Sequence, residues 1–273
     1  RRLEVLGCAV DVVPERSTAE DLLRELGDVR DLVVAEKYQS RAAELASTFG
    51  ILTASIADAA ENADVIVVAV KPSDVDSVVT EIAKIDLDGE QEQLIVSLAA
   101  GVPTSKFEPK LPAGFPVVRV MPNTPMLVGE GVSVLAPGKY AKAEHIELVR
   151  TILSSVGKVV TVKEHQLDAV TAVSGSGPAY FFLVAEAMID AGVALGLRRD
   201  IASALVVQTM IGSGVMMDRS DETPTELRYA VTSPGGTTAA AVRKLEQNGL
   251  RTAFFDALDA AKARSTEMGV TAE

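Results

Sequence analysis

The chain has 273 residues, of which 48% are hydrophobic and 23% are charged, and its formal net charge is −12. This composition excludes a disordered chain, and a negative charge without any Lys- or Arg-rich block excludes nucleic acid and anionic membranes as expected partners. One cysteine and two histidines are too few for a disulfide framework or a Cys/His zinc site, so we expect no metal centre and a reducing, cytoplasmic location.

Short β-branched runs alternate with longer amphipathic stretches over about the first 165 residues. This alternation is typical of a parallel sheet covered by helices. We expect strands at 3–7, 31–35, 64–70, 94–98, 117–121, 131–135 and 158–162. Helices are expected at 40–49, from Pro72 onward, and at 141–154.

The second half of the chain has a different character, because Ala, Leu, Val and Met recur at helical spacing after residue 165. Helices are expected at 179–195, 200–217, 237–247 and 249–267. The stretch 201–217 is apolar nearly all round, which indicates either a subunit interface or the central helix of a monomeric bundle. Since no apolar run approaches ~18 residues, we expect no membrane span. The sequence predicts an α/β domain over 1–164 and an all-helical domain over 165–273.

The turn after the first predicted strand lacks the usual signal of a dinucleotide-binding fold. That signal is a glycine-rich loop, whose bare backbone lets a pyrophosphate approach a helix N-terminus. Here Gly7 is followed by Cys-Ala-Val-Asp-Val-Val-Pro. Asp11 and Glu15 would place negative charge beside a pyrophosphate, and Pro14 has no N–H to donate. Taken alone, the first thirty residues argue against nucleotide binding.

Three small or polar elements follow predicted strands, at the edge where open α/β sheets bind their ligands. Ala-Val-Lys-Pro at 69–72 brings Lys71 either to a cofactor phosphate or ribose, or into solvent. Leu-Ala-Ala-Gly at 98–101 permits either the close approach of a flat ring or tight packing. Met-Pro-Asn-Thr-Pro at 121–125 holds Asn123, a donor and an acceptor, in a rigid turn.

Two elements in the helical half combine glycines with hydroxyls. Ser-Gly-Ser-Gly-Pro at 174–178 runs into a predicted helix, so it forms either an anion site of backbone N–H groups and hydroxyls or an ordinary Ser-capped helix start. Thr-Ser-Pro-Gly-Gly-Thr-Thr at 232–238 precedes another helix. This element either places the Thr238 hydroxyl in contact with a small polar ligand or forms only a turn between helices with a threonine cap.

Together these segments, with Asp-Ala-Val-Thr at 168–171, resemble pyrroline-5-carboxylate reductase over about residues 29–268. The resemblance implies a Rossmann-like domain followed by a helical substrate-binding and dimerisation domain, with dimers often joined into a decamer. It also implies reduction of L-1-pyrroline-5-carboxylate to L-proline by NAD(P)H, the last step of proline synthesis. The family more often prefers NADPH. Glu36 would favour the ribose hydroxyl of NADH, whereas Lys37 and Arg41 nearby would favour a 2′-phosphate.

The resemblance assigns roles to individual residues. Thr238 would hydrogen-bond the ring nitrogen and take part in catalysis. The substrate would be bound by Glu164, Ser174, Gly175, Ser176, Gly177, Gly236, Thr237 and Thr238. The cofactor would be bound by Gly7, Glu36, Lys37, Val70, Lys71, Pro72, Ala99, Ala100 and Asn123.

The chain departs from the family pattern between residues 8 and 27. Relatives carry Gly-x-Gly-x-x-Gly/Ala after the first strand, whereas this chain diverges after Gly7 and rejoins the pattern at 29–36. Such a loss and recovery at nearly preserved length indicates a locally shifted reading frame or a sequence error, and a truly diverged loop is the alternative. Two other functions therefore remain open. One is a catalytically silent relative that acts as a ligand-binding or oligomeric protein, and the other is a reductase of another small imine.

Overall fold

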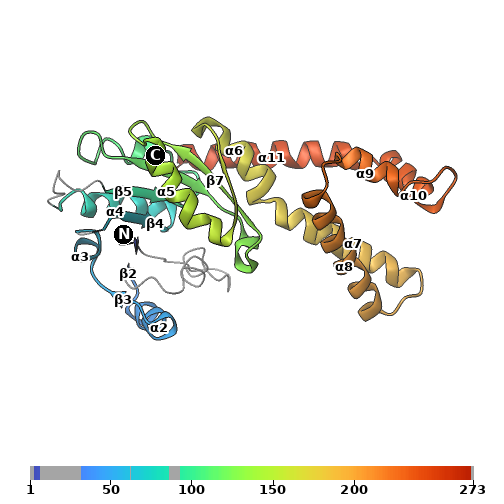
Figure 1. The fold of residues 1–273 in the computed structure, drawn as a ribbon, viewed down its shortest axis with the longest axis horizontal. Helices are drawn as coiled ribbons and strands as arrows, with labels where there is room; N and C mark the ends of the chain where they lie inside the picture. The colour runs from blue at the N-terminus through green and yellow to red at the C-terminus, as the bar shows by residue number, and fades with distance from the viewer. Residues whose placement is uncertain (1–2, 7–31, 62, 86–92, 272–273) are drawn as a thin grey trace. The chain divides into compact units, whose positions relative to one another are not determined.

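The computed structural model describes residues 3–6, 32–61, 63–85 and 93–271 (Figure 1). The chain divides into two compact units. The first unit contains the residues up to Ser176 together with those from Ala261 onward, and the second contains Gly177–Ala260. The domain boundary expected between residues 164 and 165 stays a prediction. The two compact units separate twelve residues later, after Ser176, and the first unit also includes the end of the chain.

An eight-stranded sheet in the order β3-β2-β1-β4-β5-β6-β7-β8 forms the first unit. All neighbouring strands are parallel except β6 and β7. A parallel return needs a crossover of about a dozen residues or more, and only nine residues, 122–130, join these two strands. The strands are β1 (Leu3–Leu6), β2 (Leu32–Ala35), β3 (Leu52–Thr53), β4 (Val65–Val68), β5 (Leu94–Ser97), β6 (Val117–Met121), β7 (Gly131–Pro137) and β8 (Gly157–Thr161).

The sheet has a hydrophobic core on each face, because successive side chains of a strand point to opposite sides. On β4, Val65 and Val67 pack in the core that α2 and α5 complete, whereas Ile66 and Val68 pack with α3 and α4. All four side chains are buried, which explains the unbroken apolar run of this strand. The helices are α2 (Gln39–Phe49), α3 (Ile56–Ala60), α4 (Val75–Ile82) and α5 (Ala143–Leu153).

The rest of the described chain is helical, as predicted. The four expected helices are confirmed, and two short helices, α6 and α9, add to them. The second of these, α9, has a clear sequence signal. Its sequence signal is Thr223-Pro-Thr-Glu226, in which the Thr223 hydroxyl accepts from the Glu226 N–H and Pro224 occupies the first turn. The helices are α6 (Leu167–Val170), α7 (Gly177–Ala194), α8 (Arg199–Arg219), α9 (Pro224–Ala230), α10 (Thr237–Gln247) and α11 (Leu250–Thr271).

The second unit exposes many large apolar side chains. Phe182 is 69% exposed and Phe255 is 74% exposed. By length and composition alone, Glu164–Ala194 and Arg199–Arg219 could cross a membrane, and only 11% of each apolar window is buried. Because the core helix of a soluble protein passes the same test of length and composition, the expected absence of a membrane span stays a prediction. This exposed surface agrees with the interface predicted over 201–217, since monomeric soluble proteins rarely leave such large apolar patches open.

Candidate active site

The strand ends of the sheet bring the predicted cofactor residues to one edge. β1, β4, β5 and β6 are parallel, and the chain builds β2 and β3 on one side of β1 and β4 to β6 on the other. Ligands of open α/β sheets bind at such a switch point, beyond the carboxyl ends of the strands. Val70, Lys71 and Pro72 follow β4 and are half-buried, whereas Ala99 and Ala100 follow β5. Gly7, the remaining predicted contact after β1, lies outside the described residues.

At the end of β2, acidic and basic side chains stand together. The Tyr38 N–H donates to Glu36 Oε1 at 3.0 Å. Lys37 Nζ lies 3.7 Å from Asp74 Oδ1, and Arg41 pairs with Glu44 at 2.7 Å. These groups offer a carboxylate for a ribose hydroxyl and cations for a phosphate, so this edge suits either form of a nicotinamide dinucleotide.

Asn123 joins the strand edge to the glycine–serine segment. Its Oδ1 accepts from the Val132 N–H at 2.8 Å, and its Nδ2 donates to the Ser174 carbonyl at 3.1 Å. The first contact secures the turn after β6 to the start of β7. The second fixes the backbone at Ser174. The amide therefore fixes the position of one predicted site segment relative to the other.

The glycine–serine segment differs from the helix start expected for it. Thr171–Gly175 forms a π-helical turn that continues α6, and the Ser176 N–H donates to the Thr171 carbonyl at 2.8 Å. The segment does run into a helix, as predicted, because α7 begins at Gly177, but the residues before that helix are helical as well. A β-carbon at position 175 would lie 2.6 Å from Met121 Cε, so glycine lets this turn pack against the end of β6. Single π turns inside helices often mark functional sites.

The second glycine–hydroxyl element leads into a helix, α10, as its sequence predicts. Gly235 has a φ of +70°, and Gly236 is the N-cap of α10 without any side-chain cap bond. Thr237 is exposed, and Thr238 is half-buried in the first turn of the helix. Since a helix N-terminus carries partial positive charge and spare N–H donors, this turn suits a carboxylate.

Glu164 belongs to a polar network that the sequence analysis did not foresee. Its carboxylate accepts from the Thr104 N–H at 2.7 Å and the Thr104 hydroxyl at 2.8 Å, and it lies 3.6 Å from Arg119 Nη1. Burial lowers the pKa of the Arg119 guanidinium, and the carboxylates of Glu164 and Asp168 oppose that shift. The available signal was an arginine inside the apolar strand 117–121, since a buried charge needs partners.

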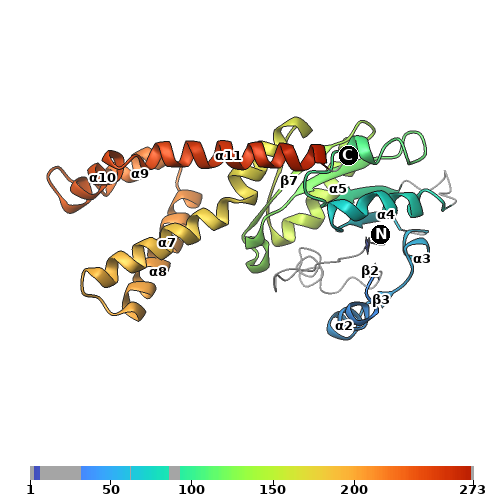
Figure 2. The same cartoon turned by 180° about the vertical axis from the view of Figure 1, so that it is seen from behind.

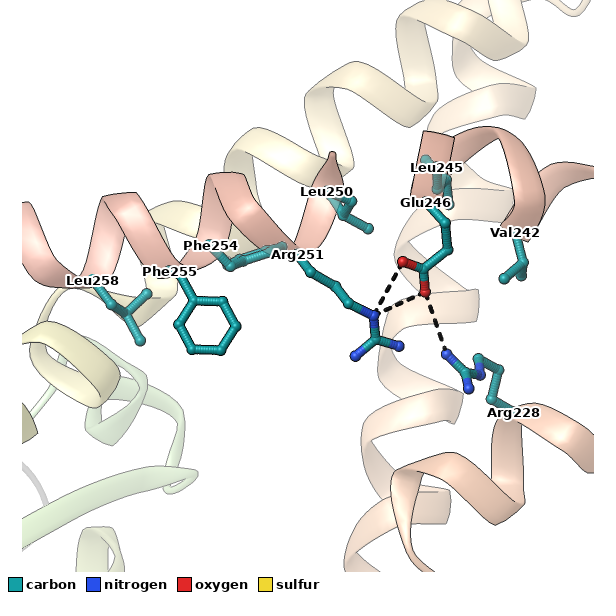
Figure 3. Close-up of a pocket in the computed structure, with 9 residues that line it drawn as sticks. All are labelled: Arg228, Val242, Leu245, Glu246, Leu250, Arg251, Phe254, Phe255 and Leu258. Atoms are coloured by element: carbon teal, nitrogen blue, oxygen red, sulfur yellow. Dashed lines mark hydrogen bonds and ion pairs between the residues drawn. The ribbon is translucent and has the colours of Figure 1, made fainter. Parts of the chain in front are cut away.

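One cavity of about 460 Å³ lies in the second unit, among α9, α10 and α11 (Figure 3). Its wall is mostly apolar, and Glu246 pairs there with Arg251 at 2.9 Å and with Arg228 at 3.8 Å. None of the predicted site residues lines it. Among the described residues, no group of three or more His, Cys, Asp or Glu side chains could hold a metal ion.

Comparison with known proteins confirms the resemblance. Residues 164–268 match the family described as pyrroline-5-carboxylate reductase dimerisation, and residues 16–101 match that described as NADP oxidoreductase coenzyme F420-dependent. The pyrroline-5-carboxylate reductase of Mycobacterium tuberculosis is 50% identical over 272 residues, which cover 92% of each chain.

Solved structures agree with this match over nearly the whole chain. A pyrroline-5-carboxylate reductase from Coxiella burnetii has a TM-score of 0.88 at 33% identity and covers 98% of this chain and 99% of its own. Plasmodium falciparum pyrroline carboxylate reductase with NADP bound has a TM-score of 0.81 at 30% identity and covers 98% of both chains. With its strand edge, its glycine–hydroxyl segments and this identity over most of its length, the chain belongs to the pyrroline-5-carboxylate reductase family.

Proposed function

We propose that the protein reduces L-1-pyrroline-5-carboxylate to L-proline with NADPH, the last step of proline synthesis. The observation that carries the proposal is the Asn123 amide, which ties the strand edge to the glycine–serine segment through bonds of 2.8 and 3.1 Å. A hydride transfer needs its two partners side by side, and this contact joins the two segments assigned to them. The relatives named pyrroline-5-carboxylate reductase support the same reaction.

For this reaction the protein mainly has to position the substrate beside the cofactor. NADPH, when bound, supplies the hydride, and a protonated cyclic imine is already a good acceptor. The chain therefore has to anchor the substrate carboxylate, orient the ring nitrogen and exclude water. We assign the carboxylate to the backbone of Ser174, Gly175, Ser176 and Gly177 and to Gly236 and Thr237. We assign the ring nitrogen to Thr238.

The cofactor is assigned to the strand edge. Val70, Lys71, Pro72, Ala99, Ala100 and Asn123 would line it, with Gly7 where β1 ends. Lys37 and Arg41 would receive the 2′-phosphate of NADPH, and Glu36 would let NADH serve as well. Glu164 would lie close to the substrate. Because Thr104 and Arg119 already engage its carboxylate, we propose that it positions the site rather than exchanges protons.

The protein's assembly follows from its dimerisation region and its exposed apolar helices. A partner copy of the chain would cover apolar side chains such as Phe182 and Phe255. We propose a homodimer that assembles further into a decamer in the cytoplasm, with neither nucleic acid nor membrane as a partner. The net charge of −12 supports the absence of polyanionic partners.

The function is tested by NADPH oxidation with racemic pyrroline-5-carboxylate, beside a panel of cyclic imines of other ring sizes. We expect the five-membered carboxylate to give the highest kcat/KM, because the site anchors a carboxylate next to a small ring. Faster turnover of another imine would reassign the substrate. No NADPH binding at millimolar concentration would instead indicate a catalytically silent relative.

Thr238→Ala is expected to lower kcat severalfold or more. The hydroxyl is a weak acid, so we expect it to orient the ring nitrogen or to relay a proton through water. The helix itself should persist, since its N-cap is Gly236 and no threonine side chain caps it. Steady-state kinetics of Thr238→Ala, Thr238→Ser and the exposed control Thr252→Ala would check this. An unchanged kcat in Thr238→Ala would remove the hydroxyl from the mechanism.

A further inference from the structure

The turn after β5 carries the two alanines assigned to the cofactor. The Val102 N–H donates to the Ala99 carbonyl at 3.4 Å and closes the turn. Gly101 has a φ of +75°, which glycine adopts without strain. Ala99 and Val102 are 3% exposed, whereas Ala100 is exposed at the strand edge. The position of Ala100 therefore depends on whatever packs against Gly101.

The last turns of α11 pack against this glycine. A β-carbon added at Gly269 would lie 3.0 Å from the Gly101 carbonyl oxygen, and one added at Gly101 would lie 3.4 Å from the Gly269 nitrogen. The two backbones thus lie in close contact, and a β-carbon at Gly269 would fit only if the turn at Gly101 moved by a few tenths of an ångström. Figure 2 shows the end of α11 beside the sheet, and this end belongs to the first compact unit.

A second contact fixes the same end of α11 independently. The Ser265 hydroxyl donates to Asp168 Oδ1 at 2.8 Å, and the Thr266 hydroxyl donates to Asp168 Oδ2 at 2.9 Å. Asp168 lies on α6, just before the π-helical turn. One helix end therefore contacts both the turn after β5 and the helix that leads into the glycine–serine segment.

We propose that the end of α11 is part of the cofactor site, with Gly269 as a positioning residue that sets where Ala99 and Ala100 stand. The inference rests on the proposed function, because that function assigns these alanines to the cofactor. Gly269 acts through Gly101 and touches no reacting atom. Because Gly269 has no side chain, α11 can pack closely against the turn after β5 and fix its position. The hydrogen bonds of Ser265 and Thr266 to Asp168 fix the position of the helix along its axis.

The test compares Gly269→Ala and Gly269→Val with the wild type. An added β-carbon has to displace the turn by a few tenths of an ångström, and valine has to displace it further. We expect the NADPH dissociation constant and the KM for NADPH to rise severalfold in the alanine variant and further in the valine variant. The kcat at saturating NADPH and the KM for pyrroline-5-carboxylate should stay near the wild-type values. In the free protein, amide hydrogen exchange of 99–104 should become faster.

The matched control is Arg264→Ala, on the same turns of α11, where the side chain makes an exposed pair with Glu267. It should leave cofactor binding unchanged. Unaltered NADPH affinity and unaltered exchange in Gly269→Val would overturn the inference. So would an equal loss in kcat and both KM values, which would indicate general destabilisation. A wild type that neither binds NADPH nor reduces the substrate would refute the proposed function instead.

Discussion

Replacing residues 8–27 by a loop of family type, with Gly-x-Gly-x-x-Gly after β1, is expected to tighten NADPH binding about a hundredfold. Between Gly7 and Gly27 the sequence has no glycine and carries Asp11, Pro14 and Glu15, whereas a glycine-rich loop would present backbone N–H groups to the pyrophosphate. Each hydrogen bond to a charged group contributes about 1.5–3 kcal/mol, so two restored donors account for the gain. Fluorescence titration of NADPH against both proteins measures it.

Charge and backbone contributions can be separated with a second variant. Asp11→Asn combined with Glu15→Gln removes the two negative charges and adds no glycine. We expect it to recover only a small part of the affinity, and we expect the difference from the native protein to vanish in high salt, because salt screens the repulsion between carboxylates and phosphates. Equal affinity in the native and the glycine-loop protein would show that the pyrophosphate is held elsewhere on the strand edge.

Local patterns predicted most of the fold. The apolar runs of β4, β5 and β6 and the periodicity of α8 and α10 gave these elements to within a few residues. The reversal at β7 was missed, although the nine residues between the predicted strands 117–121 and 131–135 are already too few for a parallel crossover. The π-helical turn was also missed. Glycine usually destabilises a helix, but Gly175 lies within the π-helical turn, where the missing side chain leaves room for Met121.

Candidate site residues could be named from the sequence where they stand in short motifs, and their binding roles stay predictions. Asn123 and Gly236 stand in short motifs next to the elements that hold them. The network around Arg119 could not be predicted, because its members come from distant segments. Thr104 and Glu164 are 60 residues apart, and Asp168 and Ser265 are 97 apart. Nothing in a single sequence shows which distant residues contact one another, although a charged residue within an apolar strand indicates that it has partners.

Arg119→Met is expected to destabilise the protein by about 3 kcal/mol, because removing one partner of a buried ion pair leaves the others without compensation. Arg119 is 8% exposed, its Nη1 lies 3.6 Å from Glu164 Oε1, and the carboxylates of Glu164 and Asp168 both stabilise its charge. Methionine keeps the length and apolar character of the side chain, so the loss reports charge rather than packing. Urea denaturation at pH 7 and a fixed protein concentration measures the change, since self-association shifts the midpoint.

Two further variants assign that loss to its cause. Arg264→Met breaks only an exposed pair and should change stability by about 0.5 kcal/mol or less. Glu164→Gln keeps an oxygen that can accept from Thr104 but removes the charge that Arg119 offsets. In that background Arg119→Met should cost less, and the difference is the coupling energy of the pair. Equal costs in both backgrounds would show that the Glu164 charge does not contribute to the stabilisation by Arg119.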